Sequence, residues 1–358
     1  MEDMAVRDAG AAAFWRGKRV LLTGHTGFKG SWLTIWLNRL GADVAGLSLM
    51  PVTTPNLFTE AKIEKLCDDR VCDIRKATTV ARIVRLVRPQ IVFHLAAQPL
   101  VRASYREPLD TFAANVMGTA HVLEALRAVG GARVAVMITT DKVYREGAGR
   151  AFREDDPLGG HDPYSASKAA CEMVIASYRD SFLAAEGMAV ASARAGNVIG
   201  GGDWSEDRIV PDAVRAWQAG RTLEVRQPDA VRPWQHVLEP LSGYLTLARK
   251  LWHDPKLAAA YNFGPGRNGA VAVRDLVESA RKAFGGGKVR YGKTPAGPHE
   301  AAFLALDAGK ARKALGVKPK LTLPRAVDMT MAWYRAQRGG ADPLALCRAD
   351  IEAYEALA

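Results

Sequence analysis

The sequence is poor in cysteine and has no long apolar run. It holds four cysteines in 358 residues. Cys67 and Cys72, the only two that lie close together, have neither zinc-type spacing nor nearby histidines, so we expect reduced thiols and no metal site. No apolar run approaches the roughly 20 residues that cross a bilayer. The start of the chain, Met1–Met4, carries acids where a signal peptide needs bases. These absences predict a cytoplasmic protein without a membrane partner.

A concentrated run of basic residues is also missing. Lysine and arginine number 49 against 38 acidic residues, a formal charge of +11, but they are scattered along the chain. Scattered charge does not favour nucleic acid or a membrane surface as a partner, and it leaves a phosphorylated ligand or simple solubility as its explanation. Hydrophobic residues make up 48% of the chain, which is enough for a large core and excludes a disordered protein.

Apolar runs alternate with helical patterns through the first half of the chain. Short apolar strands are predicted at residues 19–23, 43–47, 70–72, 90–95, 133–139 and 188–194. The main helices between them are predicted over residues 31–40, 77–87, 111–129 and 164–183. Strands that are apolar throughout are buried on both faces, so the alternation predicts an α/β fold in which a doubly wound parallel sheet carries helices on both sides.

A glycine-rich turn follows the first strand. Residues 24–30 spell Gly-His-Thr-Gly-Phe-Lys-Gly between a strand and a helix. Glycines let the backbone approach a pyrophosphate, and the helix N-terminus supplies free N–H groups, so the turn predicts a Rossmann-type dinucleotide site. Its expected contacts are Gly24, Thr26, Gly27, Phe28, Lys29 and Gly30. Lys29 either faces the pyrophosphate or is solvated. Residues 47–49 carry neither an acid for the ribose nor an arginine for a 2′-phosphate, which leaves NAD and NADP open at this position.

The pattern changes after residue 198, where the elements become shorter and more mixed. We expect residues 17–198 to form the dinucleotide-binding domain, with later returns to the sheet near 231–253. Residues 199–340 are expected to form a smaller mixed α/β substrate-binding lobe that is interleaved with it. Residues 1–16 are predicted to be a poorly ordered leader, and 341–358 a helical extension without an assigned role.

A tyrosine and a lysine open the helix predicted over 164–183. Tyr164 and Lys168 are four residues apart and share one helix face. A lysine cation favours the phenolate, so the tyrosine can exchange a proton near neutral pH. Thr139 and Thr140 end the fifth strand, and ligands gather at the carboxyl ends of strands in such sheets. These residues together predict a hydride-transfer site.

Asp141 and Lys142 follow the two threonines directly. An acid and a base at this place indicate a second proton transfer in addition to the hydride transfer. The alternative is a surface ion pair at a strand end. A lysine that acts as a base needs a lowered pKa, which burial and Lys168 favour and Asp141 opposes.

The chain resembles the nucleotide-sugar-modifying branch of the extended short-chain dehydrogenase/reductase superfamily over about residues 17–335. Within that branch it is similar to the nucleotide-sugar 4,6-dehydratases. The thymidine-linked members of these enzymes carry Asp-Glu where this chain has Asp141-Lys142, and the cytidine-diphosphate-glucose members carry Asp-Lys. The segments that support the resemblance are 24–33, 94–102, 115–119, 156–164, 194–204 and 232–237.

The resemblance implies an NAD-dependent 4,6-dehydration of a nucleotide sugar. The sugar is oxidised at C4, loses water between C5 and C6, and takes the hydride back at C6. Tyr164 would deprotonate the C4 hydroxyl, Lys168 would tune Tyr164 and hold the nicotinamide ribose, and Thr140 would position the C4 oxygen. Asp141 would be the acid at the C6 oxygen and Lys142 the base at C5. The product would supply deoxysugars of cell-surface polysaccharide.

The same resemblance extends the two binding sets. Further cofactor contacts would be Asp73, Ile74, Leu95, Ala96, Ala97, Asn115 and Thr139. Substrate contacts would be Gln98, Asn197, Arg208 and Arg232. Asp73 is alternatively an ordinary acid at a strand end, and Arg232 part of a surface ion pair.

The two longest predicted helices resemble a dimer-forming bundle, so we expect a homodimer or a larger homo-oligomer. Competing functions are an epimerase, or a dehydratase of another nucleotide sugar. A rival from a different class is a regulator that binds NAD(H) without catalysis.

Overall fold

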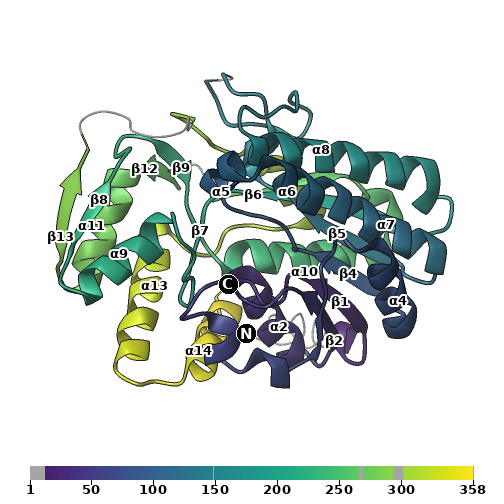
Figure 1. The fold of residues 1–358 in the computed structure, drawn as a ribbon, viewed down its shortest axis with the longest axis horizontal. Coiled ribbons are helices and arrows are strands. Elements are labelled where there is room, and N and C mark those ends of the chain that lie inside the picture. Colours follow the sequence, from purple (N-terminus) through teal and green to yellow (C-terminus); the bar gives the residue numbers. More distant parts are fainter. Residues whose placement is uncertain (1–12, 148, 266–268, 293–300, 358) are drawn as a thin grey trace.

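A computed structural model describes residues 13–147, 149–265, 269–292 and 301–357. A seven-stranded sheet with the order β11-β6-β5-β4-β1-β2-β3 lies at its centre, and all its pairings are parallel (Figure 1). The six strands expected from the sequence are confirmed within two residues at either end. Because β1 lies between β2 and β4, the topological switch point is at its carboxyl end. The strands are β1 (Arg19–Thr23), β2 (Asp43–Ser48), β3 (Asp68–Val71), β4 (Ile91–His94), β5 (Val134–Ile138), β6 (Ala189–Ala195) and β11 (Ala260–Phe263).

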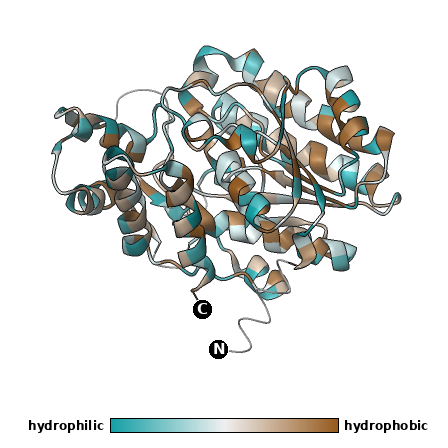
Figure 2. Ribbon diagram, turned by 90° about the horizontal axis from the view of Figure 1, so that it is seen from below, coloured by the Kyte–Doolittle hydropathy of each residue, from teal (hydrophilic) through white to brown (hydrophobic). Residues whose placement is uncertain are grey.

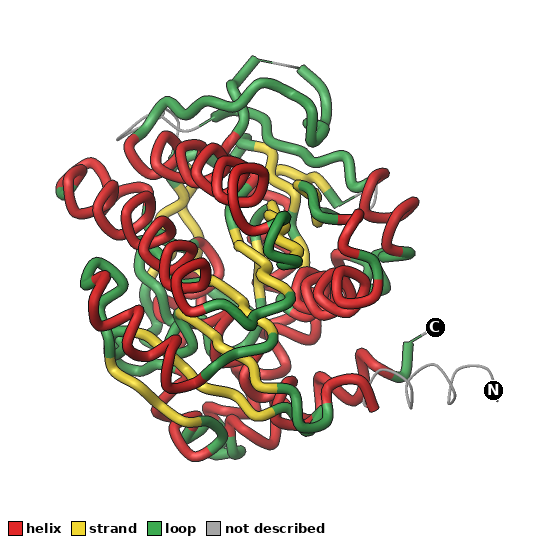
Figure 3. Tube along the Cα trace, turned by 90° about the vertical axis from the view of Figure 1, so that its right-hand side faces the viewer, coloured by secondary structure: helices red, strands yellow, loops and turns green. Residues whose placement is uncertain are grey.

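The sheet is buried on both faces because side chains alternate along each strand. In β1, Val20 and Leu22 belong to one apolar cluster and Leu21 belongs to another. Figure 3 shows the strands running between helices on both sides, and Figure 2 shows the hydrophobic residues gathered in the interior. The first cluster includes side chains from α2 (Phe28–Arg39) and α10 (Leu238–His253), and the second from α4 (Ala77–Val87), α7 (Gly118–Val129) and α8 (Pro163–Tyr178).

The long helices differ in detail from the sequence expectation. The helix predicted over 111–129 is built from α6 (Pro108–Phe112), a π-helical stretch and α7, and α8 likewise ends in π-helical residues. The helix predicted from residue 31 begins at Phe28, because Gly27 is already its N-cap. Two short helices, α3 (Leu57–Glu60) and α5 (Val101–Arg106), follow β2 and β4.

Beyond β6 the chain forms small paired strands and helices. Within the range 231–253, where the sequence predicted a return to the sheet, α10 packs against it, and the strand that joins the sheet follows as β11. The pairs are β7 (Val198–Ile199) with β10 (Gln235–His236), β8 (Thr222–Val225) with β13 (Lys288–Tyr291), and β9 (Val231–Pro233) with β12 (Ala270–Ala272). The helices are α9 (Ile209–Gln218), α11 (Val273–Phe284), α12 (Gly309–Leu315) and α13 (Leu323–Arg338). Of these elements, β8, β9, β12, β13, α9, α11 and α13 lie on the left of Figure 1.

From residue 13 on, the N-terminal segment is more ordered than the sequence predicted. Trp15 is 2% exposed, and its ring centre lies 6.0 Å from that of Phe93 in β4. An aromatic side chain of this size stabilises the fold once it enters the core, so the expectation of a poorly ordered leader is wrong for residues 13–16. The expectation for residues 1–12 lies outside the described residues.

The predicted C-terminal helix is confirmed as α14 (Pro343–Glu355). It buries Cys347, Ile351 and Tyr354 in the first apolar cluster, and Trp36 of α2 donates its indole N–H to Glu355 at 2.7 Å. The helix therefore packs against the sheet domain. Throughout the part of the chain that the structure covers, no helix is both long and apolar enough to pass through a membrane.

Candidate active site

Glycines shape the turn between β1 and α2. Gly24 has a φ of +79°, and a Cβ at this position would lie 2.7 Å from the backbone nitrogen of Ala96. Gly27 is the N-cap of α2, and no side chain caps the helix. A Cβ on Gly30 would overlap the carbonyl oxygen of Gly24. The first N–H groups of α2 thus remain available to an anion at the positive end of the helix dipole, which fits the pyrophosphate of a dinucleotide.

Two side chains of this turn join it to the surrounding protein. The hydroxyl of Thr26 shares a hydrogen bond with Ser48 Oγ and donates to the carbonyl oxygen of Leu49, each at 2.8 Å. Phe28 faces Gly200, where a Cβ would lie 3.0 Å from its ring. Both contacts fix the turn against neighbouring segments.

The carboxyl end of β5 carries the acid–base pair. Asp141 is 1% exposed, and its Oδ1 accepts hydrogen bonds from Thr140 Oγ1 and Lys142 Nζ, each at 3.0 Å. Its buried Oδ2 has no hydrogen-bond partner within the described residues. The pair is therefore not a surface ion pair, because the carboxylate is inside the protein. A buried oxygen of this kind is a place for a ligand's hydroxyl group.

Tyr164 and Lys168 approach this turn from the start of α8. Both are buried, and Asp162 caps the helix by accepting from the Ser165 N–H at 2.9 Å. Burial raises the pKa of Tyr164 to about 12, which the Thr140 hydrogen bond and the Arg208 charge oppose. We expected Lys168 to lower this pKa, but the Lys168 ammonium donates to the carbonyl oxygen of Ile138 at 3.2 Å. Burial therefore dominates the proton affinity of the phenol.

Lys29 faces the same group of side chains. Burial lowers the pKa of Lys29 to about 7, and the positive charges of Arg208, Lys168 and Lys142 act in the same direction, while Asp141 opposes them. Because the charges of Asp141 and Lys142 act on Lys29, this side chain lies near the acid–base pair. Of the two alternatives for Lys29, the structure therefore favours a side chain that faces the site over one that is solvated. Lys29 thus lies within electrostatic reach of three further cationic side chains, and such a concentration of positive charge suits a polyanionic ligand.

Gln98 and Asn115 are occupied by contacts within the chain. Asn115 accepts from the Gln98 N–H at 2.8 Å and donates to Ser167 Oγ of α8 at 2.9 Å. The Gln98 side-chain amide donates to Thr111 Oγ1 at 2.9 Å and accepts from the Leu100 N–H at 2.6 Å. These bonds hold the half-buried loop Leu95–Ala97 at the end of β4. They give no support to a substrate contact through the Gln98 side chain.

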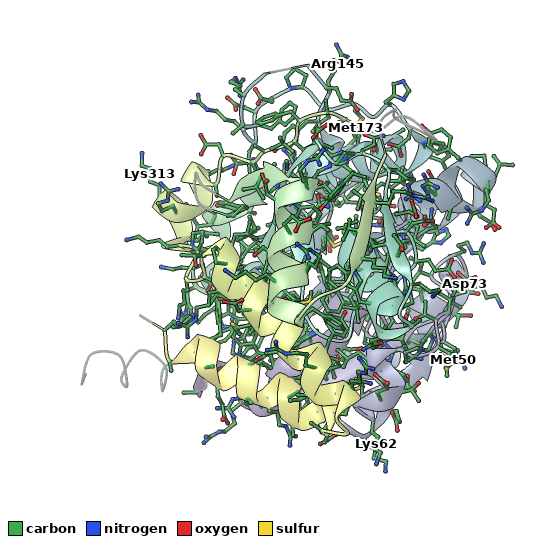
Figure 4. The ribbon with its side chains drawn as sticks, turned by 90° about the vertical axis from the view of Figure 1, so that its left-hand side faces the viewer. Met50, Lys62, Asp73, Arg145, Met173 and Lys313 are labelled. Atoms are coloured by element: carbon green, nitrogen blue, oxygen red, sulfur yellow. The ribbon has the colours of Figure 1, made fainter. Side chains whose placement is uncertain are left out.

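Asp73 lies at the far end of the same sheet edge. The Asp73 carboxylate accepts from the Arg75 side chain at 2.7 Å, and this hydrogen bond lowers the pKa of Asp73. Figure 4 labels Asp73 and Met50 on the same side of the molecule, where β3 and β2 end. Ile74 beside it is 6% exposed. The position of Asp73 suits a contact with the adenosine end of a dinucleotide that is bound at the turn after β1. The ion pair between Asp73 and Arg75 is equally consistent with an ordinary acid at the end of a strand.

The substrate candidates beyond β6 differ in their surroundings. The buried Oδ1 of Asn197 has no hydrogen-bond partner among the residues that the structure describes. The positive charge of Arg208 opposes the rise in the pKa of Tyr164 and adds to the lowering of the pKa of Lys29, so Arg208 lies near both side chains. Arg232 is 6% exposed and donates to the carbonyl oxygen of Val231 at 2.9 Å.

Comparison with known proteins identifies the family. A family profile described as GDP-mannose 4,6 dehydratase matches residues 21–330. The chain belongs to this family. Its seven-stranded sheet and its glycine turn are those of a Rossmann fold.

Related family members support the assignment. CDP-glucose 4,6-dehydratase of Salmonella typhimurium is 42% identical over 95% of this chain and 97% of its own length. A dTDP-glucose 4,6-dehydratase of Streptomyces antibioticus is 30% identical over 91% of this chain and 95% of its own. The crystal structure of a dTDP-glucose 4,6-dehydratase from Streptomyces venezuelae with NAD bound has a TM-score of 0.77 and 25% identity, covering 91% of this chain and 99% of that one.

Sequence reasoning missed a buried group next to these residues. Thr139 donates its hydroxyl to Glu172 of α8 at 2.5 Å, and Glu172 pairs with Arg194 of β6. Glu172 stands one turn after Lys168 on the same helix face, which was the signal available in the sequence. The side chain of Thr139 is therefore engaged with Glu172.

Proposed function

We propose that this family member catalyses the NAD-dependent 4,6-dehydration of CDP-glucose to CDP-4-dehydro-6-deoxyglucose. The observation that carries the proposal is the buried Asp141 paired with the half-buried Lys142 beside Tyr164, because an acid and a base are what water elimination needs in addition to hydride transfer. The choice of CDP-glucose rests on the 42% identity with a CDP-glucose 4,6-dehydratase over almost the whole chain.

The glycine turn fits NAD, which when bound accepts the hydride from C4 and returns it to C6. The free N–H groups at the start of α2 would hold the pyrophosphate. Lys168 would hold the nicotinamide ribose, and Asp73 would contact the adenosine end. Solved structures with the same fold contain bound NAD.

Tyr164 takes the proton of the C4 hydroxyl while Thr140 positions the oxygen. Asp141 then protonates the C6 hydroxyl as water leaves, and Lys142 removes the C5 proton and later returns it. The 3.0 Å hydrogen bond between Lys142 Nζ and Asp141 Oδ1 makes these two roles one unit. A proton that moves from the ammonium to the carboxylate leaves a neutral amine as the base and a carboxylic acid as the donor. Asn197, Arg208 and Arg232 would bind the sugar and diphosphate.

A product assay by mass spectrometry tests this function. The protein with NAD is incubated separately with CDP-, dTDP-, UDP- and GDP-linked sugars. We expect loss of one water from CDP-glucose without accumulation of NADH. Water loss from another nucleotide sugar alone would change the substrate, an isomer of unchanged mass would indicate an epimerase, and no reaction would contradict the proposal. Lys142→Met should stall after C4 oxidation, whereas an epimerase should tolerate it.

We infer further that the protein is a homodimer through the face formed by α6 and α8 together with the π-helical residues that follow each of these helices. Large apolar side chains stand exposed there, which is typical of an interface. They are Leu109 (83%), Met117 (49%), Met173 (61%) and Phe182 (42%). Sedimentation should show a dimer for the native chain and a monomer for Met173→Glu/Phe182→Glu, while the control Val52→Glu, at another exposed apolar residue, stays dimeric. The four free thiols support a cytoplasmic location.

A further inference from the structure

A buried ion pair connects the three elements that carry the active site. Glu172 of α8 and Arg194 of β6 are each 4% exposed at the side chain and approach to 2.9 Å. Glu172 also accepts from Thr139 Oγ1 at 2.5 Å and from Ser192 Oγ at 2.6 Å, and Arg194 makes a second contact with it at 3.0 Å. The carboxylate therefore receives four hydrogen bonds, which is the condition for keeping a charge inside a protein.

The same pair reaches the other end of the Asp141–Lys142 turn. Arg194 donates to the hydroxyl of Tyr144 at 2.8 Å, and Tyr144 donates to Asn262 Oδ1 of β11 at 2.6 Å. Burial raises the pKa of Tyr144 to about 12, so its hydroxyl stays protonated near neutral pH and can make both bonds. The Tyr144 ring stacks on Phe152 at 4.8 Å. The turn of residues 140–143 is thus held through Thr139 before it and Tyr144 after it.

We propose that Glu172 and Arg194 are positioning residues that set the acid–base pair Asp141–Lys142 against Tyr164 and Lys168. Glu172 is on the helix that carries Tyr164 and Lys168, while its partners Thr139 and, through Arg194, Tyr144 flank the turn that carries Asp141 and Lys142. The pair thereby links the group for hydride transfer to the group for water elimination. This inference rests on the proposed function.

Two steps of one reaction make this arrangement testable. C4 oxidation depends on Tyr164 and Lys168, which stay on α8 when the turn moves, and on Thr140 at the start of the turn. Water elimination depends on Asp141 and Lys142, which follow Thr140 and shift with the turn. Loosening the turn at its Tyr144 end should therefore slow elimination more than oxidation, because a small misplacement of a proton donor costs a large factor in rate.

Tyr144→Phe and Thr139→Val each remove one hydroxyl at one end of the turn and keep the apolar packing. Tyr261→Phe is the matched control, since it removes a buried tyrosine hydroxyl whose 2.8 Å hydrogen bond goes to Leu257 outside the network. In the protein without substrate, we expect amide hydrogen exchange at residues 140–144 to be about 10-fold faster in both variants and unchanged in the control.

With NAD and CDP-glucose, we expect Tyr144→Phe to lose water about 10-fold more slowly at a similar KM, with NADH and the C4-oxidised sugar accumulating. The positioning role would be overturned if amide exchange at residues 140–144 and the ratio of the oxidation rate to the water-loss rate were the same in Tyr144→Phe as in Tyr261→Phe. It would also be overturned if Tyr144→Phe slowed oxidation and elimination by the same factor. Absence of water loss in the native protein would instead overturn the proposed function, and the exchange measurement would still decide the positioning role.

Discussion

At the residue scale, Tyr164 combines a buried phenol with a neighbouring hydroxyl. Burial raises the pKa of Tyr164 to about 12 and the Thr140 hydrogen bond opposes the rise. The base is the phenolate, so we expect the rate of C4 oxidation to increase with pH through the alkaline range. Thr140→Val should raise the pKa further and slow oxidation at pH 8 by about 10-fold, equivalent to about one pKa unit, while Thr140→Ser should retain the native profile. The pH dependence of kcat checks this, and identical profiles for Val and Ser would contradict it.

Lys29 leads to a prediction about proton uptake. Its pKa is lowered to about 7 by burial and by neighbouring cations, so the side chain is mostly neutral at pH 8. A bound diphosphate favours the ammonium form and raises this pKa, so binding should take up about one proton at pH 8. Calorimetry in two buffers of different ionisation enthalpy measures the uptake. Lys29→Met should abolish it and the exposed control Lys62→Met should not; equal uptake in both would exclude Lys29 as the acceptor.

At the element scale, the carboxyl ends of β1, β4, β5 and β6 meet at one edge of the sheet. The alternation of strands and helices predicts this meeting, because parallel strands joined by helices all end on the same side. The roles of the individual side chains at this edge of the sheet were harder to predict from the sequence. Gln98 and Asn115 end up holding the loop after β4, since an amide that finds partners within the chain is not available to a ligand.

Helix α14 contributes to stability through its buried face. Ile351 is 0% exposed in the first apolar cluster. We expect Ile351→Ala to lower the free energy of unfolding by about 2–5 kcal/mol, the usual cost of a large-to-small change in a core. Glu352→Ala, the neighbouring exposed position paired with Arg39, should cost at most about 1 kcal/mol. Chemical denaturation measures both, and equal effects would show that α14 is not part of the core.

At the scale of the whole molecule, cofactor binding should stabilise the fold. A ligand at 100 times its Kd adds about 2.7 kcal/mol to the free energy of unfolding, so NAD should raise the thermal midpoint. Gly24→Ala should remove this gain, because its φ is +79° and a Cβ would press on Ala96. Gly131→Ala is the matched control, since it has a φ of +85° with no atom within 4 Å of its Cβ. A gain that persists in Gly24→Ala would exclude the turn as the NAD site.

The sequence by itself determined the local features of this protein. Apolar runs, glycines and the Tyr-x-x-x-Lys spacing act over a few residues, so the strands, the parallel sheet and the family were foreseeable. Only the tertiary structure decided which polar side chains meet. Glu172 and Arg194 are separated by 22 residues and Tyr144 and Asn262 by 118, and their partnership arises because the fold brings distant segments into a buried space where each polar group must find a partner. For the same reason the burial of Tyr164 and Lys29, which sets their pKa values, belongs to the packed molecule.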